Sequence, residues 1–128
     1  MIVLDTHAWL WWASSPELLS AEARKAIDGA RRLRISAMSC WEAAKLIEKK
    51  RLTVATEPRE WIRQACRFSR LDVEPVTAEI ATLSVFLPAP FHGDPADRLI
   101  VATALSLDAP LVTKDDAIRG SGVVRAIW

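Results

Sequence analysis

The chain has 128 residues, of which 51% are apolar and 26% charged, a globular composition with enough length for one ordinary domain. With 17 Lys and Arg against 16 Asp and Glu, the formal net charge of +1 excludes a polycation that coats nucleic acid non-specifically. The two cysteines lack a paired spacing, which argues against a disulfide scaffold or a cysteine zinc site. No apolar run is long enough for a membrane span or a signal peptide, so the expected location is the cytosol.

Strand and helix patterns alternate along the chain. Short apolar runs predict strands over residues 1–4, 33–38, 71–76, 110–113 and 123–127. Apolar residues at helical spacing predict helices between them, over residues 8–12 and starting near Ser15, Ser39, Pro58, Thr77 and Asp94. Pro88, Pro90 and Gly93 predict a loop. The alternation indicates an α/β fold in one domain over residues 1–128, with a mostly parallel five-stranded sheet between helical layers.

Acidic residues stand where predicted strands end or helices start. Asp5 follows the first strand, and Asp115 follows the fourth. Glu42 falls in the predicted first turn of the helix after the second strand, and Asp97 falls at the start of the helix before the fourth. Ligands of parallel sheets bind beyond the carboxyl ends of strands, near the point where the strand order reverses. We therefore expect these four acids to meet at one edge of the sheet.

Four clustered carboxylates repel one another, and a divalent cation would relieve that repulsion. Mg²⁺ and Mn²⁺ prefer oxygen ligands, and a site of carboxylates without His or Cys suits phosphate-ester chemistry on one or two ions. Without these four acids, 17 basic residues face 12 acidic ones, a net charge of +5. This balance fits a polyanionic substrate.

The acids also have structural interpretations that the sequence leaves open. Glu42 can complete the capping box of its helix, and Asp97 can complement a helix dipole. Asp94 is interpreted as an N-cap, and Asp115 has the position of a turn residue before a short helix. Only Asp5 has no structural role that the sequence suggests.

Other polar residues have supporting interpretations. Thr6 and Thr113 either orient waters and acids or are ordinary threonines at strand ends. Arg98 follows an acid and can pair with a carboxylate or contact phosphate. His7 and His92 are interpreted as packing or loop residues, because neither has a metal-ligand spacing.

Two further patterns concern partners. A basic stripe on the predicted helix after residue 58 fits either a phosphate backbone or a solvated helix face; it consists of Arg59, Arg63, Arg67 and Arg70. Four tryptophans lie too close in sequence for all to be buried; they are Trp9, Trp11, Trp12 and Trp41. We expect some of them to cover a partner surface, and we favour this use over stacking on RNA bases.

Four segments resemble those of PIN-domain ribonucleases, and more narrowly of the VapC toxins of bacterial and archaeal toxin–antitoxin pairs. The segments are residues 2–7 (IVLDTH), 39–43 (SCWEA), 92–100 (HGDPADRLI) and 111–115 (LVTKD). The resemblance implies a parallel five-stranded sheet and a Mg²⁺- or Mn²⁺-dependent endonuclease that acts on RNA. It places the family's acidic quartet on Asp5, Glu42, Asp97 and Asp115, and leaves open whether Asp115 or Asp116 faces the metal. It also implies a homodimer and a small cognate antitoxin that covers the active-site groove.

We therefore expect a metal-dependent endoribonuclease. Asp5, Asp97 and Asp115 would hold the principal ion, and Glu42 would help to ligate it, bind a second ion or orient the attacking water. One alternative is another metal-dependent phosphohydrolase, although His7 stands where aspartyl-phosphate phosphatases carry a second Asp. The other is a catalytically silent PIN-like module for dimerisation or partner binding, against which the intact set of four acids argues.

Overall fold

The computed structural model describes residues 1–88, 91 and 93–128. Within them the strands form one five-stranded, fully parallel sheet in the order β3-β2-β1-β4-β5, which confirms the predicted sheet. The strands are β1 (Ile2–Leu4), β2 (Leu33–Ser36), β3 (Leu71–Glu74), β4 (Leu111–Val112) and β5 (Ala126–Ile127). Pro90, which is part of the predicted loop, and His92, interpreted as a packing or loop residue, lie outside the described residues.

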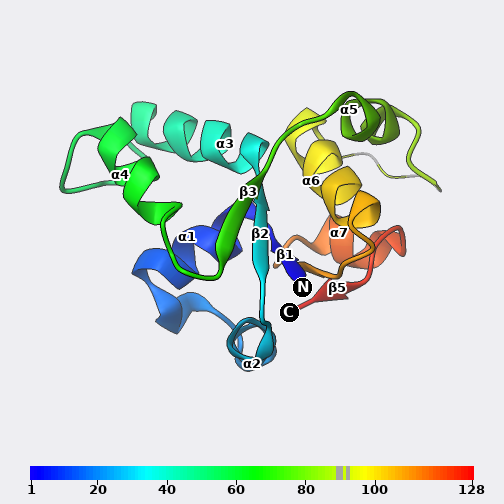
Figure 1. Cartoon of the computed structure of the whole chain (residues 1–128), viewed down its shortest axis with the longest axis horizontal. Helices are drawn as coiled ribbons and strands as arrows, with labels where there is room; N and C mark the ends of the chain where they lie inside the picture. Colours follow the sequence, from blue (N-terminus) through cyan, green and yellow to red (C-terminus); the bar gives the residue numbers. More distant parts are fainter. Residues whose placement is uncertain (89–90, 92) are drawn as a thin grey trace.

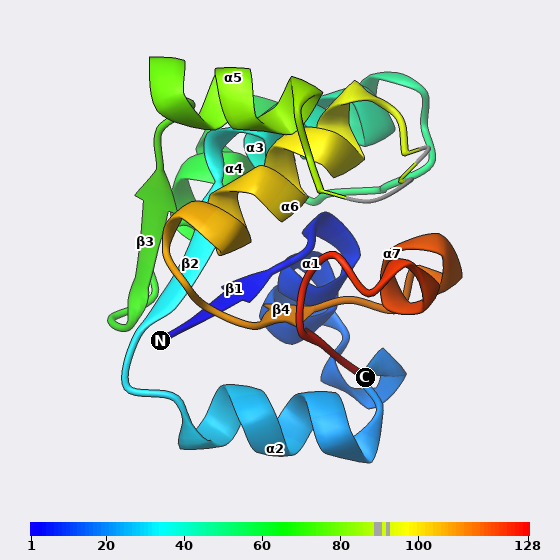
Figure 2. The same ribbon diagram turned by 90° about the vertical axis from the view of Figure 1, so that its right-hand side faces the viewer.

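Helices cover both faces of this sheet, as expected for three α/β/α layers (Figures 1 and 2). They are α1 (Thr6–Ser14), α2 (Ala21–Gly29), α3 (Ala37–Glu48), α4 (Pro58–Ala65), α5 (Ala78–Val85), α6 (Pro95–Ser106) and α7 (Asp116–Ser121), with a short 3-10 helix η1 (Pro16–Leu18). In Figure 1, α1, α3 and α4 lie on one side of the sheet and α5, α6 and α7 on the other. None of the helices in the described part of the chain combines the length and the apolar character that a membrane span needs.

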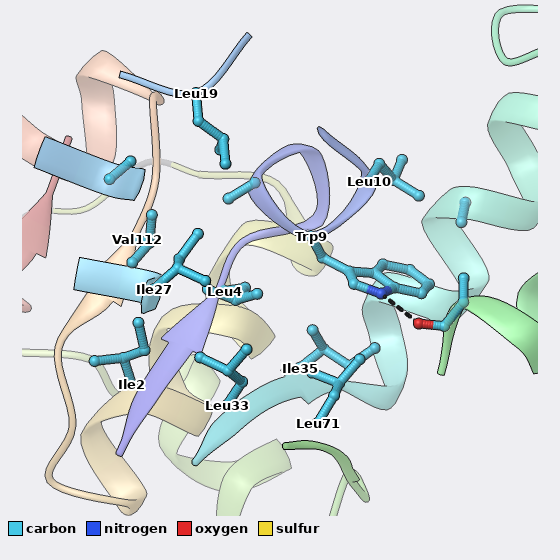
Figure 3. Packing of buried hydrophobic residues seen from close by; sticks show 14 residues of the cluster. Ile2, Leu4, Trp9, Leu10, Leu19, Ile27, Leu33, Ile35, Leu71 and Val112 are labelled. Atoms are coloured by element: carbon cyan, nitrogen blue, oxygen red, sulfur yellow. Dashed lines mark hydrogen bonds between the residues drawn. The ribbon is translucent and has the colours of Figure 1, made fainter. Parts of the chain in front are cut away.

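The central strand β1 feeds two cores, because successive side chains of a strand point to opposite faces. Ile2 and Leu4 join the core that includes residues of α1 and α2, whereas Val3 joins the core that includes residues of α6. Trp9 is fully buried in the first core, where its indole Nε1 donates a 3.0 Å hydrogen bond to the Ala65 carbonyl (Figure 3). Truncating a core aromatic of this size costs about 3–5 kcal/mol. Asp5 is therefore carried by a strand and a helix that are both anchored in the core.

Helix caps agree with the sequence patterns at two helices and disagree at another. Thr77 and Asp94 cap α5 and α6 as predicted. The pattern at Ser15 opens only η1 and makes no side-chain cap, so the prediction of a longer helix from this residue is wrong. α2 begins after Ser20, whose hydroxyl accepts the capping hydrogen bond.

The start of α3 also differs from the prediction. Ser36 is the N-cap, and its Oγ accepts a 3.0 Å hydrogen bond from the Met38 backbone N–H. The predicted strand therefore loses residues 37 and 38 to the helix, and the predicted capping box at Ser39 is wrong. Glu42 stands in the second turn of α3 rather than the first, so it has no part in capping and its side chain is available to the site.

The predicted arginine stripe is not one continuous helix face, because α4 ends at residue 65. Only Arg59 and Arg63 lie on the helix, and Arg63 pairs with Glu60. Arg67 and Arg70 follow the helix end, where i, i+4 spacing no longer aligns side chains. The Arg70 guanidinium donates to two backbone carbonyls near the C-terminal end of α2. Its role is therefore to join two segments of the fold.

Candidate active site

Asp5 is held between β1 and the turn that follows β4. Its Oδ1 accepts a 2.8 Å hydrogen bond from the Thr6 backbone N–H, which makes Asp5 the N-cap of α1. Its Oδ2 accepts a 2.6 Å hydrogen bond from Thr113 Oγ1. Burial raises the pKa of Asp5, although these two hydrogen bonds oppose the rise. Capping is a structural role that the sequence did not reveal.

The same threonine positions Asp115. The Asp115 backbone N–H donates a 3.1 Å hydrogen bond to Thr113 Oγ1, so one hydroxyl connects both acids. Asp115 Oδ1 also accepts a 2.9 Å hydrogen bond from the Ile118 N–H and caps α7, which confirms its predicted place before a short helix. The neighbouring Asp116 side chain is 98% exposed. Asp115, rather than Asp116, is the acid tied into the network around Asp5.

Glu42 joins this network from α3. Thr6 Oγ1 donates a 2.6 Å hydrogen bond to Glu42 Oε1 and also lies 2.9 Å from Ser39 Oγ. Burial raises the pKa of Glu42, and the nearby charges of Asp5 and Asp94 raise it further. Thr6 and Thr113 thus act as supporting groups that orient the acids, one of the two interpretations that the sequence left open.

Asp97 enters from the first turn of α6. Its backbone N–H donates a 2.8 Å hydrogen bond to the capping Oδ1 of Asp94. Among the described residues, its own carboxylate takes part in no hydrogen bond or ion pair. Burial raises the pKa of Asp97 to about 7, and the charges of Asp94, Asp5, Asp115 and Glu42 contribute to the rise. The acids therefore repel one another, as predicted for a cluster without a cation.

One pocket of about 590 Å³ collects these side chains beyond the carboxyl ends of β1 and β4, where the strand order reverses. We call it the carboxylate pocket; its lining residues are Asp5, His7, Trp11, Glu42, Asp94, Asp97, Lys114, Asp115 and Asp116. The predicted meeting of four acids from separate segments is confirmed. The pocket position of His7, Trp11 and Lys114 was not predicted. The i, i+4 spacing of residues 7 and 11 indicates only that both lie on one side of α1, and the fold then turns this side toward the pocket.

Two predictions about polar residues near the acids are corrected. Arg98 turns away from the carboxylate pocket: its Nε donates to the Ser84 carbonyl at 2.8 Å and its Nη2 to the Val85 carbonyl at 3.0 Å. A further hydrogen bond joins it to the Phe91 carbonyl. Its guanidinium is thus used to satisfy carbonyls at the C-terminal end of α5. His7 is an exposed residue of α1 that lines the pocket, so the loop interpretation is wrong, while its ring lies 5.6 Å from that of Trp11.

The donor set suits a hard divalent cation, because such ions favour carboxylate oxygens. Within residues 1–88, 91 and 93–128, however, no three carboxylate, imidazole or thiol groups are arranged around one point as a bound ion requires. The carboxylate pocket thus brings the acids together, but their oxygens do not surround one common point. The Asp97 carboxylate makes no hydrogen bond within the described part of the chain, so its rotation toward such a point would break none there.

Comparison with known proteins agrees with this geometry. The model of the PIN domain family matches residues 2–120 of the chain. Ribonuclease VapC22 of Mycobacterium tuberculosis is 40% identical over 118 residues, which cover 92% of this chain and 89% of the relative.

Solved structures with a similar fold come from several bacteria. DNA-bound VapBC from Salmonella typhimurium superimposes with a TM-score of 0.69 at 18% identity, covering 98% of this chain and 97% of that chain. VapC20 of Mycobacterium tuberculosis, described as a sarcin-ricin loop cleaving toxin, superimposes with a TM-score of 0.67 at 14% identity. The match covers 98% of this chain and 99% of that chain. FitAcB from Neisseria gonorrhoeae superimposes with a TM-score of 0.64 at 17% identity, covering 98% of this chain and 96% of that chain. At these identities the likeness shows the fold alone.

Proposed function

This chain belongs to the PIN domain family, and from that premise we propose that it is a metal-dependent endoribonuclease, the toxin of a toxin–antitoxin pair. The observation that carries the proposal is the meeting of Asp5, Glu42, Asp97 and Asp115 in one pocket at the switch point of a parallel sheet. The relative named as a ribonuclease, at 40% identity over most of both chains, supports RNA as the substrate.

The four acids have two kinds of part in this proposal. Asp5, Asp97 and Asp115 would hold a Mg²⁺ or Mn²⁺ ion, and Glu42 would help to ligate it, bind a second ion or orient the attacking water. When bound, the ion neutralises phosphate charge and lowers the pKa of a coordinated water. The Thr113 hydroxyl donates a 2.6 Å hydrogen bond to Asp5 Oδ2, which fixes this oxygen while the residue lines the pocket. This support limits the motion of Asp5 during the reaction.

We also infer an antitoxin partner and a homodimer. Solved neighbours include a toxin–antitoxin complex from Klebsiella pneumoniae and VapBC from Salmonella typhimurium, which supports the antitoxin. Large apolar side chains on the surface provide contact area for a partner or a second copy: Trp41 is 53% exposed, Val85 64% and Phe86 75%.

Cleavage of total cellular RNA by the purified protein tests the enzyme assignment. We expect discrete fragments with Mg²⁺ or Mn²⁺, and no fragments with EDTA or with the Asp97→Asn variant. Asp97 is the most informative position for this change, because the variant keeps the backbone N–H that donates to Asp94 Oδ1, so the cap of α6 is preserved. Asp116→Asn, the same change at a 98% exposed side chain, is the matched control and should cleave normally.

Cleavage that survives EDTA, or that Asp97→Asn retains, would reject the assignment. Absence of fragments together with absence of any metal effect on the melting temperature would favour a silent binding module instead.

A further inference from the structure

Trp11 stands at the edge of the carboxylate pocket. It lies one helical turn after His7 and lines the same pocket as Asp5 and Asp97. The ring of His7 lies 5.6 Å from the Trp11 ring, and that of Trp128 lies 5.8 Å from it, at tilted angles of 56° and 53°. The indole is thus supported by two rings that are not stacked flat on it, and it is only partly buried.

An exposed lysine covers this indole. The Nζ of Lys114 lies 5.6 Å from the centroid of the Trp11 ring, and the residue directly precedes Asp115. Among the described residues around the pocket, Lys114 alone has a lysine or arginine side chain. A lysine ammonium is strongly hydrated and sits on a flexible stem, so a planar nucleobase can take its place on the ring at small cost. The displaced ammonium would then be free to meet a phosphate.

We propose that Trp11 is a stacking platform for an unpaired nucleobase next to the phosphate held in the carboxylate pocket, with Lys114 contacting the backbone of that nucleotide. The inference rests on the proposed ribonuclease function and names its substrate class, RNA whose bases are unstacked near the cut. Proteins hold such splayed bases on aromatic side chains, whereas bases inside a duplex are already stacked. Because every base has a π-face, the platform tolerates different sequences.

The chain contains a matched comparison for this pair. Trp41 on α3 also has a lysine over its ring, with the Nζ of Lys45 5.8 Å from the centroid. It is 53% exposed, and it is not among the residues described as lining the carboxylate pocket. A Trp41→Ala variant therefore controls for the loss of an exposed tryptophan beside a lysine. It differs from Trp11→Ala in that Trp11 lines the carboxylate pocket, whereas Trp41 is not among its described lining residues.

The test measures binding separately from cleavage. The probe is a short single-stranded RNA of mixed sequence, fluorescein-labelled and fully 2′-O-methylated so that it resists hydrolysis, in buffer with Mg²⁺. A second probe has the same backbone without bases. Wild type and Trp41→Ala should bind the first probe roughly 5- to 100-fold more tightly than the second. Trp11→Ala should lose most of this ratio, and Trp11→Phe should keep part of it.

The ratio compares two probes on one protein, so a partly unfolded variant does not distort it. Lys114→Gln should weaken the binding of both probes alike, and it should reduce the salt dependence of binding by the amount expected for about one phosphate contact. A Trp11→Ala protein with the wild-type ratio would overturn the platform, even if the wild type cleaves RNA and the proposed function stands. A Trp11-dependent ratio in a wild type that cleaves no RNA would support the platform and reject the nuclease. Binding of neither probe by wild type would overturn both.

Discussion

Replacing Asp97 by Asn should stabilise the metal-free protein at alkaline pH. Burial and the neighbouring carboxylates raise the pKa of Asp97 from 3.8 to about 7, so the folded state binds its proton more tightly than the unfolded state does. The stability that this proton contributes is fully present below about pH 4 and is lost as the pH rises through about 7. Asn carries no charge at any of these pH values and avoids the loss.

The expected size follows from the same numbers. A pKa that rises from 3.8 to about 7 corresponds to about 4 kcal/mol, at about 1.36 kcal/mol for each unit. Asp97 is only half-buried, and solvent screens the repulsion, so we expect about half of this, ~2 kcal/mol. For a chain of this length the gain corresponds to a melting temperature higher by roughly 6–10 °C.

Urea denaturation in EDTA measures this difference. At about pH 8 the Asn variant should be more stable than wild type, and near pH 4.5 most of the gain should have vanished. Asp116→Asn, at a fully solvated position, should stay within about 0.5 kcal/mol of wild type at both pH values. Added Mg²⁺ should stabilise wild type more than Asp97→Asn, because only wild type keeps all four acids. An Asn variant no more stable than wild type at about pH 8, or a gain that persists near pH 4.5, would refute the repulsion argument.

Three further substitutions test the surroundings of the site, each by urea denaturation and RNA cleavage. Thr113→Val removes the hydroxyl that donates to Asp5 Oδ2, so it should lower the free energy of unfolding by ~1–3 kcal/mol and reduce cleavage. Thr113→Ser should preserve both stability and cleavage, and equal behaviour of the two variants would contradict this. A Cβ at Gly93 would lie 2.5 Å from Phe91 Cζ and 2.9 Å from Asp97 Cβ, so Gly93→Ala should cost ~1–3 kcal/mol and slow cleavage; unchanged stability and cleavage would contradict this. Arg98→Met removes hydrogen bonds to the end of α5 and should lower the free energy of unfolding by ~1–3 kcal/mol, while the folded fraction cleaves normally. Slower cleavage by the folded fraction would indicate that Arg98 takes part in the active site.

The sequence predicted those parts of the fold that depend on burial along the chain. Apolar runs gave all five strands: β1, β2 and β4 are mostly buried, as such runs predict, whereas the edge strands β3 and β5 are partly exposed. The meeting of Asp5 and Asp115 followed from parallel topology alone, since neighbouring parallel strands end at one edge. Asp94 was identified as a cap because an Asp before a proline at the first helical position is a local signal.

Features that depend on contacts between distant segments were missed. Ser36 and Ser39 both suit the start of α3, and the choice between them is settled by tertiary contact, since Ser39 Oγ lies 2.9 Å from Thr6 Oγ1. The direction of Arg98 depends on where α5 ends beside α6. The place of Trp11 at the pocket depends on how α1 lies against the turn after β4, which no local pattern encodes.

The two oxygens of Asp5 have separate attachments, one to the start of α1 and one to Thr113. In a genetic selection for inactive variants, changes at this position would therefore mix loss of chemistry with loss of folding. Asp97, whose carboxylate takes part in no hydrogen bond or ion pair among the described residues, would yield full-length, folded and inactive protein. Selections that also demand normal cellular abundance should consequently enrich changes at Asp97 over changes at Asp5. Two acids of one pocket thus belong to different mutational classes.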